Sequence, residues 1–394
     1  MLNTANTPQW MDKYETTLGV LNVAETCAAS ISIDDLVALC EDPNIPNPIN
    51  TSTKLTYGSI RGSQALRERL ASLYSARVSS PLPTESILIT PGAIAANFLL
   101  LYTLIGPGDH VICVHPTYQQ LYSVPESLGA EVSLWKLRKE KNYIPDIEDL
   151  KPLIKSNTKL IIINNPNNPT GSTIPKFVLQ SLIDLARTHS ITVLSDEVYR
   201  PLFHGISPID ADFPPSLISM GYEKTIITGS MSKAYSLAGI RIGWIASRSP
   251  EIIEQIASAR DYTTISVSQI DDSVATYALS ASVLHALLGR NIKLAKTNVG
   301  ILEAFVEEHK GICSWVKPTG GTTALVRFER KGVPVDDELF CVDVIEKTKV
   351  MFLPGSRCFG EEFKGFVRIG FVCETEVLQE ALEKLGVYIR ENLA

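Results

Sequence analysis

The sequence lacks both an excess of basic residues and a long hydrophobic run. Its 394 residues include 36 lysines and arginines against 43 aspartates and glutamates, which gives a formal net charge of −7. A chain with this balance has no basic excess with which to hold nucleic acid or an anionic lipid surface. The longest apolar stretch, residues 98–105, is far shorter than the ~20 residues that a membrane-spanning helix needs. We therefore expect no nucleic-acid partner and no membrane partner.

Paired cysteines and metal-ligand spacings are also missing. The seven cysteines are odd in number and scattered, and no two stand at C-x-x-C spacing. Neither a zinc site nor a disulfide framework is indicated. The six histidines show no metal-ligand spacing, so we expect no metal site. Residues 1–15 lack the basic start and apolar core of a signal peptide, and residues 391–394 match no targeting tail. These features favour a cytoplasmic enzyme with reduced thiols.

The composition that remains is that of an ordinary globular protein, and the length suggests two or three domains. Short β-branched runs alternate with amphipathic helical stretches through the middle of the chain, as in a mostly parallel sheet covered by helices. Several runs are almost continuously apolar, which is typical of strands buried on both faces. The predicted strands are residues 86–90, 110–114, 131–137, 159–163, 191–194, 224–228 and 240–246.

The pattern changes after about residue 250. An interrupted helical region over residues 250–310 precedes three further strand candidates and a final helix near residues 376–391. The first 50 residues are too few to form a core alone. We therefore predict an α/β fold with a large domain, residues 50–285, around a mostly parallel seven-stranded sheet between helices. A smaller α+β domain would combine residues 1–49 and 286–394.

The most informative stretch is TGSMSKAYSLAGIRIG, residues 228–243, which contains Lys233. A lysine taken singly is usually a solvated surface charge. The residues on both sides of Lys233 are apolar or small, which suggests an interior position. An interior lysine needs a partner or a depressed pKa, and a desolvated amine can form a Schiff base with an aldehyde.

Three other signals stand at predicted strand ends. Asp196 follows the strand ITVL, and NNPNNPTG, residues 164–171, follows another. Ligands of open α/β sheets bind at the carboxyl ends of strands. The turn at residues 90–93 leads into a helical run, whose first backbone N–H groups can hold a phosphate. Taken alone, Asp196 and the 164–171 segment are better explained as a helix cap and a turn, and the turn at residues 90–93 is a weak signal.

Together these motifs resemble the fold-type I pyridoxal-phosphate enzymes, specifically the class I/II aminotransferase family. The resemblance runs from about Leu21 to the end of the chain. Its most specific part is the S-x-S-K-x-x-x-x-x-G-x-R-x-G block at residues 230–243, supported by N-P-T-G and D-x-x-Y. The resemblance implies an aminotransferase-like fold and pyridoxal 5′-phosphate as cofactor.

The resemblance also implies roles for individual residues. Lys233 would form a Schiff base with the cofactor aldehyde and later move protons at the substrate. Asp196 would pair with the pyridine nitrogen and keep it protonated. Tyr199 and Asn168 would hydrogen-bond the phenolate oxygen, and Tyr118 would stack on the ring. The catalytic residues are thus Lys233, Asp196 and Tyr199.

The cofactor phosphate would be held by backbone and side-chain donors. These are the amides near Ala93 and Ile94, the hydroxyls of Ser230 and Ser232, and the guanidinium of Arg241.

Other matched positions concern the partner subunit and the substrate. Tyr57 matches a tyrosine that reaches a neighbouring subunit's phosphate, which implies a homodimer with shared active sites. Arg368 would bind the substrate α-carboxylate through its planar fork, with Asn168 beside it. Residues 261–268 offer no second arginine, so we do not expect a dicarboxylic amino acid as the main substrate. Glu25 could meet a cationic or hydroxylated substrate side chain.

The leading hypothesis is an aminotransferase that moves an amino group between an L-amino acid and a 2-oxo acid. The same residues would also serve a lyase or cyclase, by C–S β-elimination or β-replacement, because one scaffold hosts several reactions. A third hypothesis is a non-catalytic binding or regulatory domain that keeps the fold. The presence of Lys233, Asp196 and Arg368 argues against it.

Overall fold

A central sheet dominates the computed structural model, which describes residues 6–42, 44–76 and 80–393. Residues 1–5 and 394, which belong to the terminal segments inspected for targeting signals, lie outside it. Seven strands pair in the order β2-β8-β7-β6-β5-β3-β4. Only β8 runs antiparallel to its neighbours, so the sheet is mostly parallel as predicted. The strands are β2 (Ile87–Thr90), β3 (His110–His115), β4 (Glu131–Lys136), β5 (Thr158–Asn164), β6 (Thr192–Asp196), β7 (Thr225–Ser230) and β8 (Gly243–Ser247).

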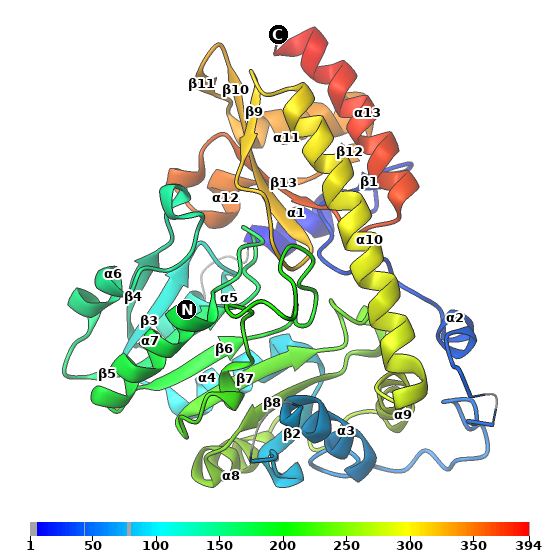
Figure 1. The fold of residues 1–394 in the computed structure, drawn as a ribbon, viewed down its shortest axis with the longest axis vertical. Coiled ribbons are helices and arrows are strands. Elements are labelled where there is room, and N and C mark those ends of the chain that lie inside the picture. The colour runs from blue at the N-terminus through cyan, green and yellow to red at the C-terminus, as the bar shows by residue number, and fades with distance from the viewer. Residues whose placement is uncertain (1–5, 43, 77–79, 394) are drawn as a thin grey trace.

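Helices cover both faces of this sheet (Figure 1). In the central strand β5, Leu160 and Ile162 join one hydrophobic core, whereas Ile161 and Ile163 join the other. Alternate side chains of a strand point to opposite faces, so a continuously apolar run supplies both cores. The first core also contains residues of α4 (Gly92–Leu104), α5 (Gln120–Ser127) and α8 (Pro250–Arg260), and the second residues of α3 (Gln64–Ser75), α6 (Ile147–Leu150), α7 (Lys176–Thr188) and α9 (Gln269–Ala278).

A smaller α+β domain stands at the other end of the molecule, and the long helix α10 (Ala281–Glu308) connects the two ends (Figure 1). Its antiparallel sheet has the order β11-β10-β14-β13, with β9 added on β10. The N-terminal strand β1 (Leu21–Asn22) pairs with β12 (Val350–Met351). Both termini therefore build this domain, which confirms the predicted fold class. The other elements are α1 (Asn6–Tyr14), α2 (Ile33–Ala38), β9 (Cys313–Trp315), β10 (Thr323–Arg330), β11 (Val333–Pro334), α11 (Asp337–Thr348), β13 (Leu353–Pro354), α12 (Gly355–Phe359), β14 (Phe366–Gly370) and α13 (Thr375–Asn392).

The domain boundaries after residues 49 and 285 stay predictions. The second of them falls inside α10, which continues unbroken across it. Among the described residues, no helix combines the length and the apolar character needed to cross a bilayer.

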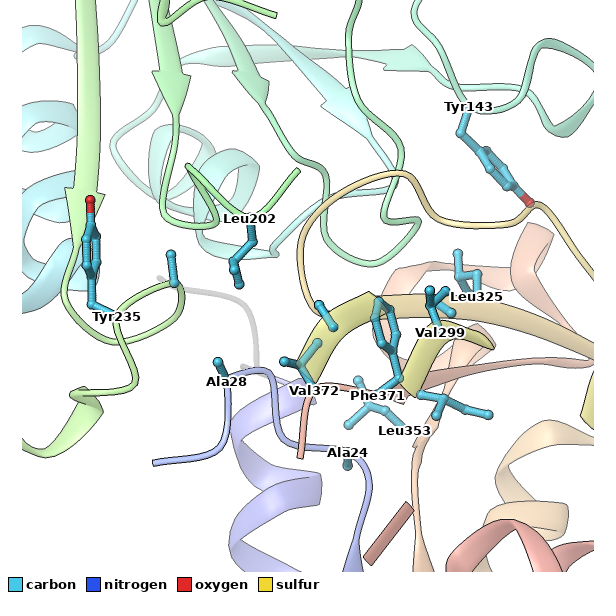
Figure 2. Packing of buried hydrophobic residues seen from close by; sticks show 14 of the residues in the cluster. Ala24, Ala28, Tyr143, Leu202, Tyr235, Val299, Leu325, Leu353, Phe371 and Val372 are labelled. Carbon is cyan, nitrogen blue, oxygen red and sulfur yellow. The ribbon is translucent and has the colours of Figure 1, made fainter. Parts of the chain in front are cut away.

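Residues 23–29 form the junction between the two sheets. The amide of Gly370 donates to the carbonyl of Val23 at 2.7 Å, and the amide of Ala28 donates to the carbonyl of Lys233 at 3.2 Å. Figure 2 shows Ala28 packed close to Val372 at this junction. A Cβ atom at Gly370 would stand 1.7 Å from the carbonyl oxygen of Glu25, so only glycine permits this approach.

One predicted strand begins later than expected. The sequence predicts a strand from residue 240, but β8 starts at Gly243. A single 3₁₀ turn at Ala238–Ile240 precedes it, and Arg241 has a left-handed backbone with φ of 51°. This conformation turns the guanidinium back, so that Nη1 donates to the carbonyl of Ala238 at 2.8 Å. The apolar alternation around Arg241 was therefore misleading.

Replacement of Asn298 should destabilise the smaller domain. This fully buried side chain of α10 donates to the carbonyls of Phe371 and Cys373, both at 2.8 Å. Asn298→Leu leaves both carbonyls buried without a donor, and we expect a loss of roughly 2–4 kcal/mol in the free energy of unfolding. Denaturant unfolding measures it. Asn157→Leu, at an exposed asparagine that donates to the carbonyl of Gly108, is the control. Equal stability of the two variants would contradict the assigned role.

Candidate active site

A cavity of about 370 Å³ lies at the carboxyl ends of the central strands. Asn164, Asp196 and Ser230 are the last residues of β5, β6 and β7, and all three line it. Parallel strands in register bring such terminal residues to one edge of the sheet. The structure brings together the predicted site residues Glu25, Ala93, Ile94, Tyr118, Asn168, Asp196, Tyr199, Ser230, Ser232, Lys233, Arg241 and Arg368 around this cavity.

Tyr57 is the exception. It is 82% exposed and lies with residues 55–58 against residues 266–269, away from the cavity of its own chain.

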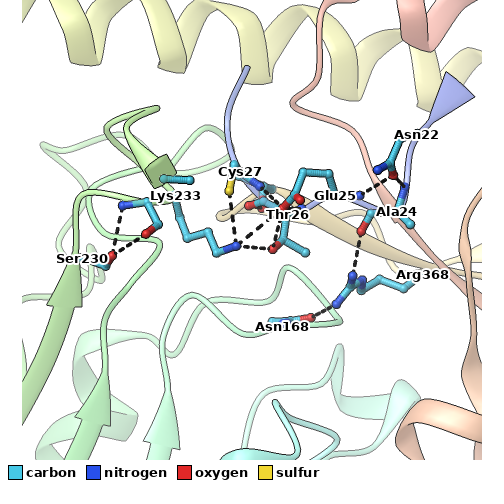
Figure 3. Close-up of polar contacts among 12 residues, drawn as sticks. Asn22, Ala24, Glu25, Thr26, Cys27, Asn168, Ser230, Lys233 and Arg368 are labelled. Carbon is cyan, nitrogen blue, oxygen red and sulfur yellow. Dashed lines mark hydrogen bonds and ion pairs between the residues drawn. The ribbon is translucent and has the colours of Figure 1, made fainter. Parts of the chain in front are cut away.

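The amine of Lys233 points from the strand edge toward the N-terminal segment (Figure 3). Its Nζ donates to Oγ1 of Thr26 at 2.6 Å and to Sγ of Cys27 at 3.4 Å. Oε1 of Glu25 lies 3.7 Å from the same nitrogen. Only 24% of the Lys233 side chain is exposed, so the sequence-based expectation of an interior lysine agrees with the geometry.

Charges near Lys233 oppose the effect of its burial. Burial alone lowers the pKa of the amine, but Cys27, Tyr199 and Glu25 raise that pKa to about 12. Burial raises the pKa of the Cys27 thiol to about 11, so the thiol is neutral at pH 7. Burial also raises the pKa of Glu25, but Lys233 and two backbone N–H groups outweigh it and lower that pKa to about 2. Glu25 is therefore the anion that holds the ammonium in the neutral range.

Asp196 is buried and oriented by two donors. Its Oδ2 accepts from Nδ2 of Asn97 at 3.0 Å, and its Oδ1 accepts from the amide of Val198 at 3.1 Å. Burial raises the pKa of this carboxyl to about 6, while both hydrogen bonds lower it. A cation in the cavity would lower the pKa further and keep the carboxylate ionised. The arrangement suits a protonated ring nitrogen.

The start of α4 forms a cradle with donors from β7 and Arg241. Two glycines make the close approach possible: a Cβ atom at Gly92 would lie 2.6 Å from Nη2 of Arg241, and one at Gly243 would lie 2.5 Å from the amide of Ala93. The hydroxyls of Ser230 and Ser232 lie 2.8 Å apart beside them. A helix start, two hydroxyls and a guanidinium are a donor set that fits a phosphate group.

Arg368 is a buried cation with acceptors but no anion. It is 3% exposed, and Nη2 donates to the carbonyl of Ala24 at 2.7 Å while Nη1 donates to Oδ1 of Asn168 at 3.2 Å. Burial lowers its pKa. No carboxylate of the described residues makes an ion pair with it, and its buried Nε has no hydrogen bond to them. A carboxylate ligand would supply the missing charge.

Several lining residues were missed from the sequence. Asn97 is a single polar residue within the apolar helix α4, and this position was its only signal. Asn164 accepts from the amide of Asn168 at 2.7 Å and so positions it. Thr7, Pro8 and Met11 of α1 line the cavity as well. Nothing in the sequence of α1 connects it to a strand edge about 200 residues away.

Similarity of the sequence and the fold to known proteins identifies the family. The profile of the family "Aminotransferase class I and II" matches residues 48–385. The chain belongs to the aminotransferase class I and II family. A solved PLP-dependent aminotransferase from Streptococcus suis is 37% identical, with a TM-score of 0.88 over 99% of this chain and 98% of that one.

Two relatives illustrate the range of names in the family. Capreomycidine synthase of Streptomyces vinaceus is 30% identical over 82% of this chain and 80% of its own length. Aspartate aminotransferase of Thermotoga maritima is 29% identical over 86% of this chain and 85% of its own length. The predicted family and the predicted class of enzyme, an amino-group transferase acting on small molecules, are confirmed.

Loss of the Glu25 charge should lower the pKa of Lys233. In the cofactor-free protein, Glu25→Gln removes the anion 3.7 Å from Nζ, and the pKa of the amine should fall by about 1 unit. The pH dependence of chemical modification of Lys233, followed by peptide mass spectrometry, measures it. Glu303→Gln, at an exposed residue paired with Lys317, is the control. An unchanged pKa in Glu25→Gln would show that the pair has no electrostatic effect.

Proposed function

We propose that this protein is a pyridoxal-phosphate-dependent aminotransferase that moves an amino group between an L-amino acid and a 2-oxo acid, with Lys233 as the amine that binds the cofactor. The observation that carries the proposal is the convergence of Lys233, Asp196 and the donor set around Arg241 on one cavity. The similar protein of Streptococcus suis is itself named PLP-dependent.

The residues present fit that cofactor. The amides of Ala93 and Ile94, the hydroxyls of Ser230 and Ser232, and Arg241 would hold its phosphate. When bound, pyridoxal phosphate supplies an aldehyde that joins to an amine and a ring that takes up the electron pair of a broken Cα–H bond.

Other side chains would fix the ring. Asp196 would face the ring nitrogen as a carboxylate, since Asn97 and the amide of Val198 hold its two oxygens in place. Tyr199 is buried and would donate with Asn168 to the phenolate oxygen. Tyr118 would stack on one face.

The substrate would be oriented by Arg368. Its planar fork can bind a carboxylate through two parallel hydrogen bonds, which a lysine cannot do. A carboxylate bound there, with Asn168 beside it, directs the Cα–H bond toward Lys233. The amine would then take and return the proton as a general base and acid. Oγ1 of Thr26, which accepts a hydrogen bond from Nζ at 2.6 Å, would keep the amine in position.

A homodimer with shared active sites is part of the proposal. Exposed apolar side chains lie along α4, where Phe98 and Tyr102 stack at 6.2 Å with 41% and 57% exposure. Tyr57 is exposed, as expected of a residue that serves a neighbouring subunit. The predicted cytoplasmic location stays a prediction of the sequence.

A lyase or cyclase is the second candidate. One relative bears the name of a synthase rather than of an aminotransferase. The same Lys233, Asp196 and Arg368 would serve either reaction, so the fold does not separate them.

The half-reaction separates the two functions. The cofactor-loaded enzyme, mixed with single amino acids and no 2-oxo acid, should form one equivalent of pyridoxamine phosphate and one of 2-oxo acid, and then stop. Liquid chromatography measures both products. Lys233→Ala should abolish the reaction while the far-ultraviolet circular dichroism stays unchanged. Repeated release of ammonia without an acceptor would instead support the lyase.

The shared site predicts an effect at Tyr57. Tyr57→Phe should weaken cofactor binding about tenfold, because one hydrogen bond to a charged group is lost. Equilibrium dialysis measures the affinity, and analytical ultracentrifugation measures the oligomeric state. Tyr14→Phe, in the helix α1, is the control. A monomer at working concentrations would refute the shared site.

A further inference from the structure

We propose that Glu25 forms a subsite for a positively charged substrate side chain, an ammonium or guanidinium group on an aliphatic stem. This inference rests on the proposed function and names its substrate class.

The first argument is the balance of charges around the cavity. Among the described residues that line it, the charged ones are Lys233, Arg241, Arg368, Asp196 and Glu25. The proposed function engages the first four with the cofactor aldehyde, the phosphate, the substrate carboxylate and the ring nitrogen. Glu25 is the remaining charge. Its counterion in this structure is Lys233, at 3.7 Å. In the proposed function this amine binds the cofactor aldehyde, which leaves Glu25 without a counterion.

The second argument is that Glu25 is a fixed and accessible anion. Its Oε1 accepts from the amide of Thr26 at 2.5 Å and from that of Cys27 at 3.1 Å. These bonds hold the carboxylate in one orientation, and 46% of the side chain remains exposed although it lines the cavity. A ligand in the cavity can therefore contact it.

The third argument is its position relative to Arg368, which Figure 3 shows beside Ala24. Nη2 of Arg368 donates to the carbonyl of Ala24, the residue next to Glu25. A substrate whose α-carboxylate replaces this contact would extend its side chain past Glu25. Pro8, Met11 and Ile94 line the same cavity and offer apolar surface to a methylene stem.

Other substrate classes fit less well. An acidic side chain would face Glu25 with like charge, and the described lining residues include no cation beyond the three already engaged. An apolar side chain would cover an ionised carboxylate without a partner, which is costly. If Glu25 acted only on the pKa of Lys233, its replacement would affect all substrates equally.

Binding of three unreactive carboxylates to the cofactor-loaded enzyme tests the subsite. The probes 5-guanidinopentanoate, hexanoate and adipate share the group that Arg368 would bind, lack an α-amine, and end in a cationic, an apolar and an anionic group. Isothermal titration calorimetry should show that 5-guanidinopentanoate binds about tenfold tighter than hexanoate, and that adipate binds weakest. Equal affinities, or tightest binding of adipate, would overturn the proposal without any variant.

The variant Glu25→Gln then locates the effect. It should remove the advantage of 5-guanidinopentanoate and leave hexanoate within about twofold of the native affinity. Glu303→Gln, distant from the cavity, should change none of the three. An equal loss for all three probes in Glu25→Gln would overturn the subsite and assign Glu25 to the amine instead.

Kinetics of the half-reaction separate this inference from the proposed function. Native enzyme should prefer ornithine and arginine over norvaline in kcat/KM. Glu25→Gln should lose about tenfold more kcat/KM with the cationic pair than with norvaline, whose own loss reports the effect of Glu25 on Lys233. No reaction with any amino acid, combined with the expected ranking of the probes, would sink the proposed function and keep the subsite. Reaction with norvaline at the rate of ornithine would do the reverse.

Discussion

The ammonium group of Lys233 lies where the edge of the large sheet meets a segment from the smaller domain. Its hydrogen bond to Thr26, at 2.6 Å, and its ion pair with Glu25 join residues 207 and 208 positions apart in the chain. A buried ammonium needs such partners. The amine proposed to react is therefore held by a contact between the edge of the large sheet and the N-terminal segment.

The same contact determines where a substrate can be held. The segment at residues 23–29 is fixed by β1 on β12 and by the approach of Gly370 to Glu25. The carbonyl of Ala24 in this segment accepts a hydrogen bond from Arg368, and this contact keeps the guanidinium at the wall of the cavity. Recognition of a carboxylate and placement of the amine thus depend on one piece of backbone.

The sequence predicts the strands of the large sheet better than the hydrogen bonds between residues far apart in the chain. Each of the seven predicted strands overlaps a strand of the large sheet, although β8 begins three residues later than predicted. The central strands were the clearest, because a strand buried on both faces requires a continuous apolar run. The sequence also identifies Lys233, Asp196 and Arg241, because each belongs to a short motif with recognisable spacing. The link from Asn97 to Asp196 and that from Arg368 to Ala24 span 99 and 344 positions, and no local pattern encodes them. The left-handed Arg241 was missed because its neighbours Ile240 and Ile242 alternate like a strand.

The division of labour between the two ends of the chain explains how one scaffold can take different substrates. In the proposed phosphate cradle, Gly92 has a φ of 80°, which other residues adopt only with strain, and a Cβ atom at Gly243 would lie 2.5 Å from the amide nitrogen of Ala93. Asp196 is buried, so the proposed cofactor side tolerates little change. The two ends of residues 23–29 are held by backbone hydrogen bonds at Val23, Ala28 and Ala29, whereas the amides of Thr26 and Cys27 donate to the Glu25 side chain. A substitution at position 25 therefore leaves the contact of Arg368 with the carbonyl of Ala24 in place but removes the ion pair with Lys233. An anion at that position, fixed by the amides that follow it, would then add selectivity for charge to a site whose proposed chemistry depends on other residues.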